Sequence, residues 1–370
     1  MPAETGPRIL IAGGGTGGHI IPALAIADEM KAQHGAELLF VGTARGLESR
    51  LVPQAGYPLQ LIRVGQLNHV SLATRLRTLV DLPLGLLQCV RLLHQFRPAV
   101  VIGVGGYASG PVMGAAILLR IPTLAFEPNA VPGLANRLVG AWVSAAAVNF
   151  APAAEYFHHA RLTGIPVRSE FFHLALRPAG APPHLLVFGG SQGARVLNAI
   201  LPKIAASLLA QVPGLTILHQ AGARHAEATL AAYQASGAPP DRWQVAAFLD
   251  DMPRRFAAAD LVLCRSGAST VAELAASAKP AVLVPFPQAA DDHQRRNAEV
   301  MADAGAARVL LEQDLNPEQL KGTLADLLAD PVRLRTMAEN ARTLAHPDAA
   351  QAIASMAMAL ARGDFRADPR

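Results

Sequence analysis

Five glycines and a histidine follow the first apolar run of this 370-residue chain, in the stretch GGGTGGH at residues 13–19. Gly13, Gly15 and Gly18 have the G-x-G-x-x-G spacing, which is typical of turns whose backbone closely approaches a ligand at a helix N-terminus. A dinucleotide site also needs an acidic residue at the end of the next strand, and the run ELLFVG is followed there by threonine and alanine. The turn therefore predicts close backbone approach to a ligand and disfavours a nicotinamide oxidoreductase, which stays an alternative.

His19 is expected at the start of the helix that follows this turn. The helix dipole there disfavours the imidazolium form and keeps the ring neutral, which is the form a general base needs near pH 7. A lone histidine is more often structural than catalytic. His19 is thus a candidate base, with a structural role as the alternative.

Two further strand-to-helix turns carry groups suited to a nucleotide. The stretch GGSQGAR, residues 189–195, places Ser191 and several backbone amides ahead of a helix, where they would bind phosphate oxygens, although Ser191 as a plain N-cap is the alternative. The stretch CRSGASTVAEL, residues 264–274, opens another helix and places Glu273 where a carboxylate would accept the hydroxyls of a ribose. Thr270 and Glu273 also have the spacing of a capping box, which needs no ligand.

Two other polar clusters follow apolar runs. In FEPNA, Glu127 and Asn129 come just past the carboxyl end of a predicted strand, where site residues gather, although both also suit a loop cap. In PQAADDHQRRNAE, Asp291 and Asp292 are adjacent and lack the D-x-D spacing of a metal-bound nucleotide-sugar site, so a solvated helix start is favoured. No cluster has metal-ligand spacing, and we predict no required metal.

Apolar runs of strand length alternate with helical patterns along the whole chain. This βαβ order predicts the α/β class with doubly wound parallel sheets, in which ligands bind beyond the carboxyl ends of the strands. The plan restarts after the proline-rich stretch RPAGAPP, so we predict two domains, 1–164 and 165–346. The predicted strands are RILIA, ELLFVG, AVVIGVGG, PTLAFE and AAVNF in the first half, and HLLVFGG, LTILHQAG, WQVAAFL, DLVLCRSG and PAVLVPFP in the second.

Composition narrows the class of protein. Hydrophobic residues make up 51% of the chain and charged residues 16%, which excludes a disordered protein. The net charge of +4 suits anionic partners, but no nucleic-acid-binding motif is present. Cys89 and Cys264 lie far apart and are expected to be free thiols in a reducing compartment. The sequence has neither a signal-peptide pattern nor an apolar run long enough to span a membrane, so we expect a protein that is not translocated.

A basic, leucine-rich stretch at residues 67–96 contains Arg75 and Arg77. Basic amphipathic surfaces lie on anionic membranes, and ordinary helices packed on a sheet have the same pattern. Both interpretations stay open for this stretch.

Taken in order, the motifs GGGTGGH, GVGGYASGP, TGIPVR, GGSQGAR, CRSGASTVAEL and PFPQAADDHQRRNA resemble the bacterial peptidoglycan N-acetylglucosaminyltransferases that act on lipid I, over nearly the whole chain. The resemblance implies a GT-B fold with two Rossmann-like domains facing across a cleft and a final helix, 347–370, packing back on the first domain. It implies inverting transfer of N-acetylglucosamine from UDP-N-acetylglucosamine to the 4-hydroxyl of undecaprenyl-diphosphate-MurNAc-pentapeptide. The product would be lipid II, which links the protein to cell-wall synthesis, cell shape and cell division.

The resemblance also implies roles for individual residues. His19 becomes the leading base candidate and Glu127 a second catalytic candidate. The residues implied in donor binding are Thr16, Gly17, Gly18, Asn129, Arg168, Ser191, Leu249, Ala268, Ser269, Thr270, Val271, Ala272, Glu273, Gln294 and Asn297. Those implied in acceptor or membrane contact are Gly14, Gly15, Tyr107, Arg75 and Arg77. Two positions depart from the family pattern, because Pro128 replaces a glutamine and Ile165 an asparagine.

The expected partners are the UDP-sugar, lipid I, an anionic membrane surface and proteins of wall synthesis, without nucleic acid. No cofactor is expected, since the UDP-sugar is a substrate, and the expected location is the cytoplasmic face of the inner membrane. A GT-B enzyme that glycosylates diacylglycerol or another glycolipid is the closest alternative. A noncatalytic sensor of nucleotide sugars is another.

Overall fold

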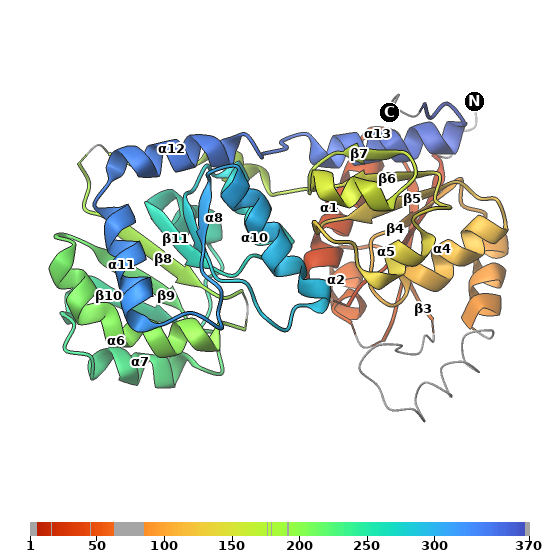
Figure 1. The fold of residues 1–370 in the computed structure, drawn as a ribbon. Helices are drawn as coiled ribbons and strands as arrows, with labels where there is room; N and C mark the ends of the chain where they lie inside the picture. The colour runs from red at the N-terminus through yellow and green to blue at the C-terminus, as the bar shows by residue number, and fades with distance from the viewer. Residues whose placement is uncertain are drawn as a thin grey trace. The chain divides into compact units, whose positions relative to one another are not determined.

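The computed structural model of the chain describes residues 6–15, 17–44, 46–62, 85–175, 177–178, 180–190 and 192–366. These residues form two compact units, Met1–Pro166 with Asp348–Arg370, and Val167–Pro347. Each unit contains one parallel β-sheet covered by helices (Figure 1).

The sheet of the first unit has seven parallel strands in the order β3-β2-β1-β4-β5-β6-β7. Its central strands are buried on both faces and are almost wholly apolar, as expected for parallel strands between helices. The strands are β1 (Arg8–Ala12), β2 (Glu37–Gly42), β3 (Leu59–Leu61), β4 (Val100–Gly103), β5 (Thr123–Glu127), β6 (Ala145–Val148) and β7 (Ala160–Leu162).

Helices cover both faces of this sheet (Figure 1). Residues 85–96 are helical, and the labelled helices are α1 (Gly17–His34), α2 (Glu48–Gln54), α4 (Ser109–Leu118), α5 (Leu134–Val139), η1 (Ala151–Tyr156) and α13 (Ala349–Arg362). Helix α13 buries an apolar stripe that includes Ile353 and Ala357 and packs against α1 and β4. It ends at Gly363, whose φ of 79° is the left-handed conformation that commonly terminates helices.

The second unit has six parallel strands in the order β10-β9-β8-β11-β12-β13. The strands are β8 (His184–Phe188), β9 (Thr216–Gln220), β10 (Trp243–Ala246), β11 (Leu261–Cys264), β12 (Ala281–Leu283) and β13 (Ala307–Val309). The helices are η2 (Ser169–His173), α6 (Arg195–Gln211), α7 (Ala226–Gln234), η3 (Pro240–Arg242), α8 (Met252–Ala258), α9 (Ala268–Ala276), η4 (Ala290–Asp292), α10 (His293–Asp303), α11 (Pro317–Leu328) and α12 (Pro331–Arg342). Leucines from α6 and α11 fill the core against strands β8 and β11.

The same winding occurs in both units. The first strand of each, β1 or β8, lies inside its sheet, with the next strand of the sequence on one side and a later strand on the other. The glycine turn that follows each of these strands therefore lies at the point where the winding reverses, which is where doubly wound sheets bind ligands. This architecture confirms the predicted α/β class with two doubly wound parallel sheets.

Candidate functional site

The first glycine turn uses most of its own amide groups to fix its conformation. The N–H of Gly13 donates to the carbonyl of Val41 over 3.0 Å, and the N–H of Gly14 donates to the carbonyl of Gly105 over 3.2 Å. The N–H of Gly15 donates to Oε2 of Glu48 over 2.7 Å. These three amides are engaged within the unit, so the amides suited to a ligand are those at the start of α1, including Gly17 and Gly18.

Glu48, at the start of α2, is the residue of this turn that the sequence analysis missed. Its side chain is 1% exposed, and Oε1 accepts hydrogen bonds from the N–H and Oγ1 of Thr43, each 2.9 Å long. Burial raises the pKa of Glu48, but the hydrogen bonds from Gly15 and Thr43 together lower it by more than burial raises it. The pKa therefore lies below the usual value. An acid six residues after ELLFVG, preceded by Gly42 and Gly46, was the available signal.

His19 lies in the first turn of α1, as predicted, and its ring faces the loop after β4. A Cβ added at Gly105 would lie 3.0 Å from Cε1 and 3.1 Å from Nδ1 of His19, so a side chain at this position would crowd the ring. Tyr107, two residues further, is 47% exposed. The first turn, the start of α1 and the loop after β4 thus come together at one edge of the sheet.

Glu127 holds the loop that follows β5. Its carboxylate, 1% exposed, accepts hydrogen bonds from the backbone and side-chain nitrogens of Asn129, the backbone of Gly133 and the side chain of Asn136, at 2.9 to 3.2 Å. Burial raises the pKa of Glu127 to about 7 against the lowering effect of these bonds. The carbonyl of Pro128 accepts from Asn149 over 3.0 Å, so the loop keeps a defined anchor where the family glutamine is absent.

In the second unit, Gln220 joins two loops that the sequence analysis treated separately. Its Nε2 donates to the carbonyl of Gly190 over 2.9 Å, and its Oε1 accepts from the N–H of Leu249 over 2.9 Å. Gln220 is 3% exposed. One amide side chain at the end of β9 therefore fixes both the second glycine turn and the loop that carries Leu249.

A neutral polar cluster holds the loop after β9, against which this turn packs. His219 is 1% exposed, its Nε2 lies 3.0 Å from Oδ1 of Asn198, and its Nδ1 lies 3.3 Å from the hydroxyl of Tyr233. Asn198 in turn donates to the carbonyl of Ala221 over 2.8 Å. Burial lowers the pKa of His219 to about 3, so the ring is neutral at physiological pH.

The structure excludes the helix-capping alternatives considered for two of the turns. The N-cap residue of α9 is Gly267, so Thr270 lies inside the first turn and does not form a capping box with Glu273. The N-cap residue of α6 is Ala194, which excludes Ser191 from that role. Helix α6 thus begins after the expected cap, and helix α9 begins before it. Asp292 is the N-cap residue of α10, in agreement with the favoured helix start.

The start of α9 is surrounded by the polar residues predicted there. Ser266 donates from Oγ to the carbonyl of Gln294 over 2.7 Å, and Asn297 donates to the carbonyl of Ser266 over 3.2 Å. The side chain of Gln294 also accepts from the N–H of Phe286 over 3.0 Å. Within the described residues, the buried Oγ of Ser269 has no hydrogen-bond partner.

Arg265 and Arg168 supply the positive charge near this helix start. Arg265 donates to the carbonyls of Val284 and Pro285 at 3.0 Å each and forms a 2.6 Å ion pair with Glu312, so it serves to hold the loop after β12. Burial raises the pKa of Glu273 to about 7, and the charge of Arg168 acts in the opposite direction. Arg265 carries no recognisable sequence signal, because its role depends on contacts far along the chain.

The structure describes some of the other predicted site residues and not others. Ala268, Val271 and Ala272 lie on α9. Thr16, Arg75, Arg77 and Ser191 lie outside the described residues. Cys89 and Cys264 are buried free thiols, as predicted. In the part of the chain that the structure describes, no three His, Cys, Asp or Glu side chains gather as metal ligands would, and no helix combines the length and hydropathy of a membrane-spanning segment.

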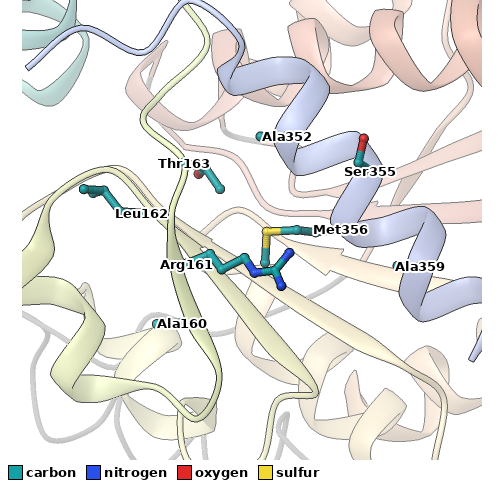
Figure 2. Close-up of a pocket in the computed structure, with 8 residues that line it drawn as sticks. All are labelled: Ala160, Arg161, Leu162, Thr163, Ala352, Ser355, Met356 and Ala359. Atoms are coloured by element: carbon teal, nitrogen blue, oxygen red, sulfur yellow. The ribbon is translucent and has the colours of Figure 1, made fainter. Parts of the chain in front are cut away.

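A cavity of about 550 Å³ lies away from these groups, between β7 and α13 of the first unit (Figure 2). Arg161 and Thr163 line one side, and Ser355 and Met356 line the other. The Arg161 guanidinium donates to the carbonyl of Arg366 over 2.9 Å and lies 5.3 Å from the ring of Phe365. None of the predicted site residues lines this cavity.

Comparison with known proteins identifies similar chains along almost the entire length. Residues 9–148 match the family "Glycosyltransferase family 28 N-terminal domain", and residues 184–353 match the family "Glycosyltransferase family 28 C-terminal domain". A protein of Anaeromyxobacter dehalogenans (strain 2CP-C), named "UDP-N-acetylglucosamine--N-acetylmuramyl-(pentapeptide) pyrophosphoryl-undecaprenol N-acetylglucosamine transferase", is 46% identical over 360 residues, covering 96% of this chain and 93% of that protein. A protein of the same name from Geobacter metallireducens is 41% identical, with 94% and 96% covered. The crystal structure of Acinetobacter baumannii MurG superposes with a TM-score of 0.80 at 33% identity, covering 95% of this chain and 99% of that one.

Proposed function

The chain belongs to glycosyltransferase family 28, and we propose that it transfers N-acetylglucosamine from UDP-N-acetylglucosamine to the muramyl sugar of lipid I, forming lipid II and UDP. The observation that carries this function is the identity of 41 to 46%, over nearly the whole chain, to relatives named for this reaction. The two doubly wound sheets are those of a GT-B glycosyltransferase.

The second unit forms the donor half in this proposal. Amides of the first turn of α9, together with the buried hydroxyl of Ser269, stabilise the charge that develops on the diphosphate as the anomeric C–O bond breaks. Glu273, one turn further along α9, accepts the ribose hydroxyls. The N–H of Leu249 is engaged by Gln220, so Leu249 offers its carbonyl to the N–H group of the uracil ring.

The first unit forms the acceptor half. Amides at the start of α1 include those of Gly17 and Gly18, for which the resemblance implies donor binding, and in this proposal they bind the diphosphate of the lipid carrier instead. The neutral imidazole of His19 takes the proton of the acceptor 4-hydroxyl as the oxygen attacks the anomeric carbon. The new C–O bond forms on the face opposite the departing UDP, which gives inversion and a β-1,4 link. Glu127 then acts by holding Asn129 and its loop rather than by proton transfer.

A peripheral position at the cytoplasmic face of the inner membrane follows from the lipid-linked acceptor. Helices α4 and α5 pack against each other and carry exposed Leu118 and Leu138, and Trp142 follows close after α5 with 68% of its surface exposed. Arg120 and Arg137 lie in the same part of the sequence. These residues, with Arg75 and Arg77, form the proposed contact with anionic lipid. Association with other proteins of wall synthesis belongs to the same proposal.

The first test is UDP release from UDP-N-acetylglucosamine by the purified protein, with and without a lipid I analogue. Acceptor-dependent release is expected for the wild-type protein. His19→Ala is expected to lower the rate by about a hundredfold or more at unchanged donor affinity, because general base catalysis contributes about 10²- to 10⁴-fold. Donor affinity is measured by calorimetric titration with UDP.

The alternatives give different results in the same assay. Release that depends on diacylglycerol instead of lipid I would assign the chain to a glycolipid transferase. Donor binding with no release under any condition would favour a sensor of nucleotide sugars. Equal rates for the wild-type protein and His19→Ala would remove His19 from the base role while leaving the transferase assignment intact.

A further inference from the structure

The carboxylate of Glu48 lies directly beneath the first glycine turn. Three donors converge on it, the N–H of Gly15 and the N–H and hydroxyl of Thr43, at 2.7 to 2.9 Å. A Cβ added at Gly14, Gly42 or Gly46 would overlap the Glu48 side chain. Glycines of the first turn, of the end of β2 and of the loop before α2 therefore leave a space that this side chain fills.

The turn held by Glu48 is coupled to the proposed base. Gly14, next to Gly15, donates its N–H to the carbonyl of Gly105, and a Cβ added at Gly106 would overlap the carbonyl of Gly14. The ring of His19 packs against Gly105 on the same loop. A shift of the turn at Gly15 would thus move both the start of α1 and the surface against which the His19 ring rests.

The three hydrogen bonds to Glu48 require that both oxygens of its side chain act as acceptors. Oε2 faces one N–H, and Oε1 faces an N–H and a hydroxyl. A glutamine in the same place would turn its NH₂ group toward Gly15 or toward Thr43, and one part-buried backbone N–H would lose its partner. The site is therefore built for a carboxylate, although it lies behind a turn that meets an anionic substrate in the proposed function.

We propose that Glu48 is a positioning residue for the acceptor half of the reaction, which fixes the Gly13–Gly15 turn and thereby the amides and the histidine at the start of α1. This inference rests on the proposed function. It assigns the carboxylate to the loop and not to the substrate. The acid that dinucleotide-binding proteins direct at a ribose after the second strand is replaced here by an acid directed at the protein's own glycine turn.

The test compares Glu48→Gln with Glu37→Gln, which makes the same chemical change at an exposed residue of β2 in the same unit. Both full-length variants are assayed for UDP release at varied lipid I analogue and titrated with UDP, at a temperature well below their unfolding transitions. We expect Glu48→Gln to lower kcat/KM for the acceptor by about a hundredfold at unchanged UDP affinity, since a misplacement of about 1 Å has an effect of this size. Glu37→Gln is expected to match the wild-type protein.

Glu48→Asp serves as the second variant, because it keeps the charge and shortens the reach by one methylene. It is expected to lose about tenfold in acceptor kcat/KM, between the wild-type protein and Glu48→Gln, and it decides the question if Glu48→Gln does not fold. Wild-type acceptor kinetics in either folded variant would overturn the inference, as would an equal loss of UDP affinity. If the wild-type protein released UDP without dependence on the lipid I analogue, the proposed function would fail first and this inference with it.

Discussion

The two glycine turns that follow β1 and β8 occupy the same place in the same winding, but they are held in different ways. In the first unit, a buried carboxylate, Glu48, accepts an N–H of the turn. In the second unit, a carboxamide, Gln220, donates to the turn and accepts from the Leu249 loop. Gly193 and Gly222 in the second unit also allow the turn at 189–194 and the loop at 221–222 to pack backbone against backbone.

This difference shows that a glycine pattern does not identify which amides bind a ligand. The first turn matches G-x-G-x-x-G, yet the amides of its first three glycines are bonded within the unit. At the second turn, the described supports are neutral: Gln220 donates to the carbonyl of Gly190, and Asn198, bonded to His219, holds the carbonyl of Ala221 on the adjoining loop. A neutral support adds no negative charge beside a turn that the sequence predicts to bind phosphate oxygens, whereas in the proposed function the lipid diphosphate binds at the start of α1 and not at the first turn itself.

The largest expected effect is on the backbone packing of the second turn. Gly193 has a φ of 74°, and a Cβ added there would overlap the carbonyl of Ala221. Gly193→Ala therefore combines an unfavourable left-handed alanine with a backbone overlap, and it is expected to lower the free energy of unfolding by about 3 kcal/mol. Urea unfolding followed by the fluorescence of Trp243, which lies in the second unit, measures this loss.

Gly190→Ala is the matched control in the same turn. Gly190 has a φ of 82°, but no atom lies within 4 Å of its added Cβ. Only the left-handed conformation is penalised, so the expected loss is about 1 kcal/mol. Equal losses for the two variants would show that backbone packing does not distinguish this turn.

The two units should respond differently to acid pH, because the loop that packs on the second turn is held by Asn198 and the neutral His219. Burial lowers the pKa of His219 to about 3, below its unfolded value of 6.5, so the folded state fails to bind a proton that the unfolded state binds below pH 6.5. His219→Gln does not titrate. The stability advantage of the wild-type protein over His219→Gln is expected to shrink by about 2 kcal/mol between pH 7 and pH 5.

Glu48→Gln provides the contrast in the first unit. In the wild-type protein, the folded pKa of Glu48 is lowered from 4.5. The stability that the ionised carboxylate contributes is therefore present above pH 4.5 and is lost only as the pH falls through the folded pKa. The stability difference between the wild-type protein and Glu48→Gln should stay constant from pH 7 to pH 5. A change in this difference as large as that for His219→Gln would contradict the assignment of charged and neutral supports.

The sequence predicted the winding better than the site. Buried parallel strands are continuous apolar runs, so all ten predicted strands are present. The missed strands are β3, β7 and β13, three-residue edge strands with too few apolar residues to form a run. Of the residues that shape the turns, His19 was predicted from its place at a helix start. Glu48 and Gln220 were missed, because each acts on a residue about thirty positions away in the sequence.

The third expected effect concerns the carboxamide of Gln220. Gln220→Glu keeps the acceptor for Leu249 but turns a second carboxylate oxygen toward the carbonyl of Gly190, where the amide now donates. The donor loops should separate, and UDP affinity is expected to fall about tenfold, or about 1.4 kcal/mol, at unchanged acceptor KM. Calorimetric titration with UDP measures this change, with exposed Gln244→Glu on β10 as the control. Unchanged UDP affinity would show that the two loops do not need a neutral clamp.

The smallest expected effect is on the hydroxyl of Thr43. Thr43→Val removes the Oγ1 donor to Glu48 and keeps the backbone N–H donor, so two of the three bonds to the carboxylate persist. The loss of one hydrogen bond should lower the free energy of unfolding by about 1 kcal/mol, while Thr43→Ser, which keeps the hydroxyl, should lose less. Because the remaining bonds include the one from Gly15, acceptor kinetics should stay close to those of the wild-type protein. A hundredfold kinetic loss in Thr43→Val would mean that the hydroxyl of Thr43, and not the Gly15 bond, transmits the effect of Glu48 to α1.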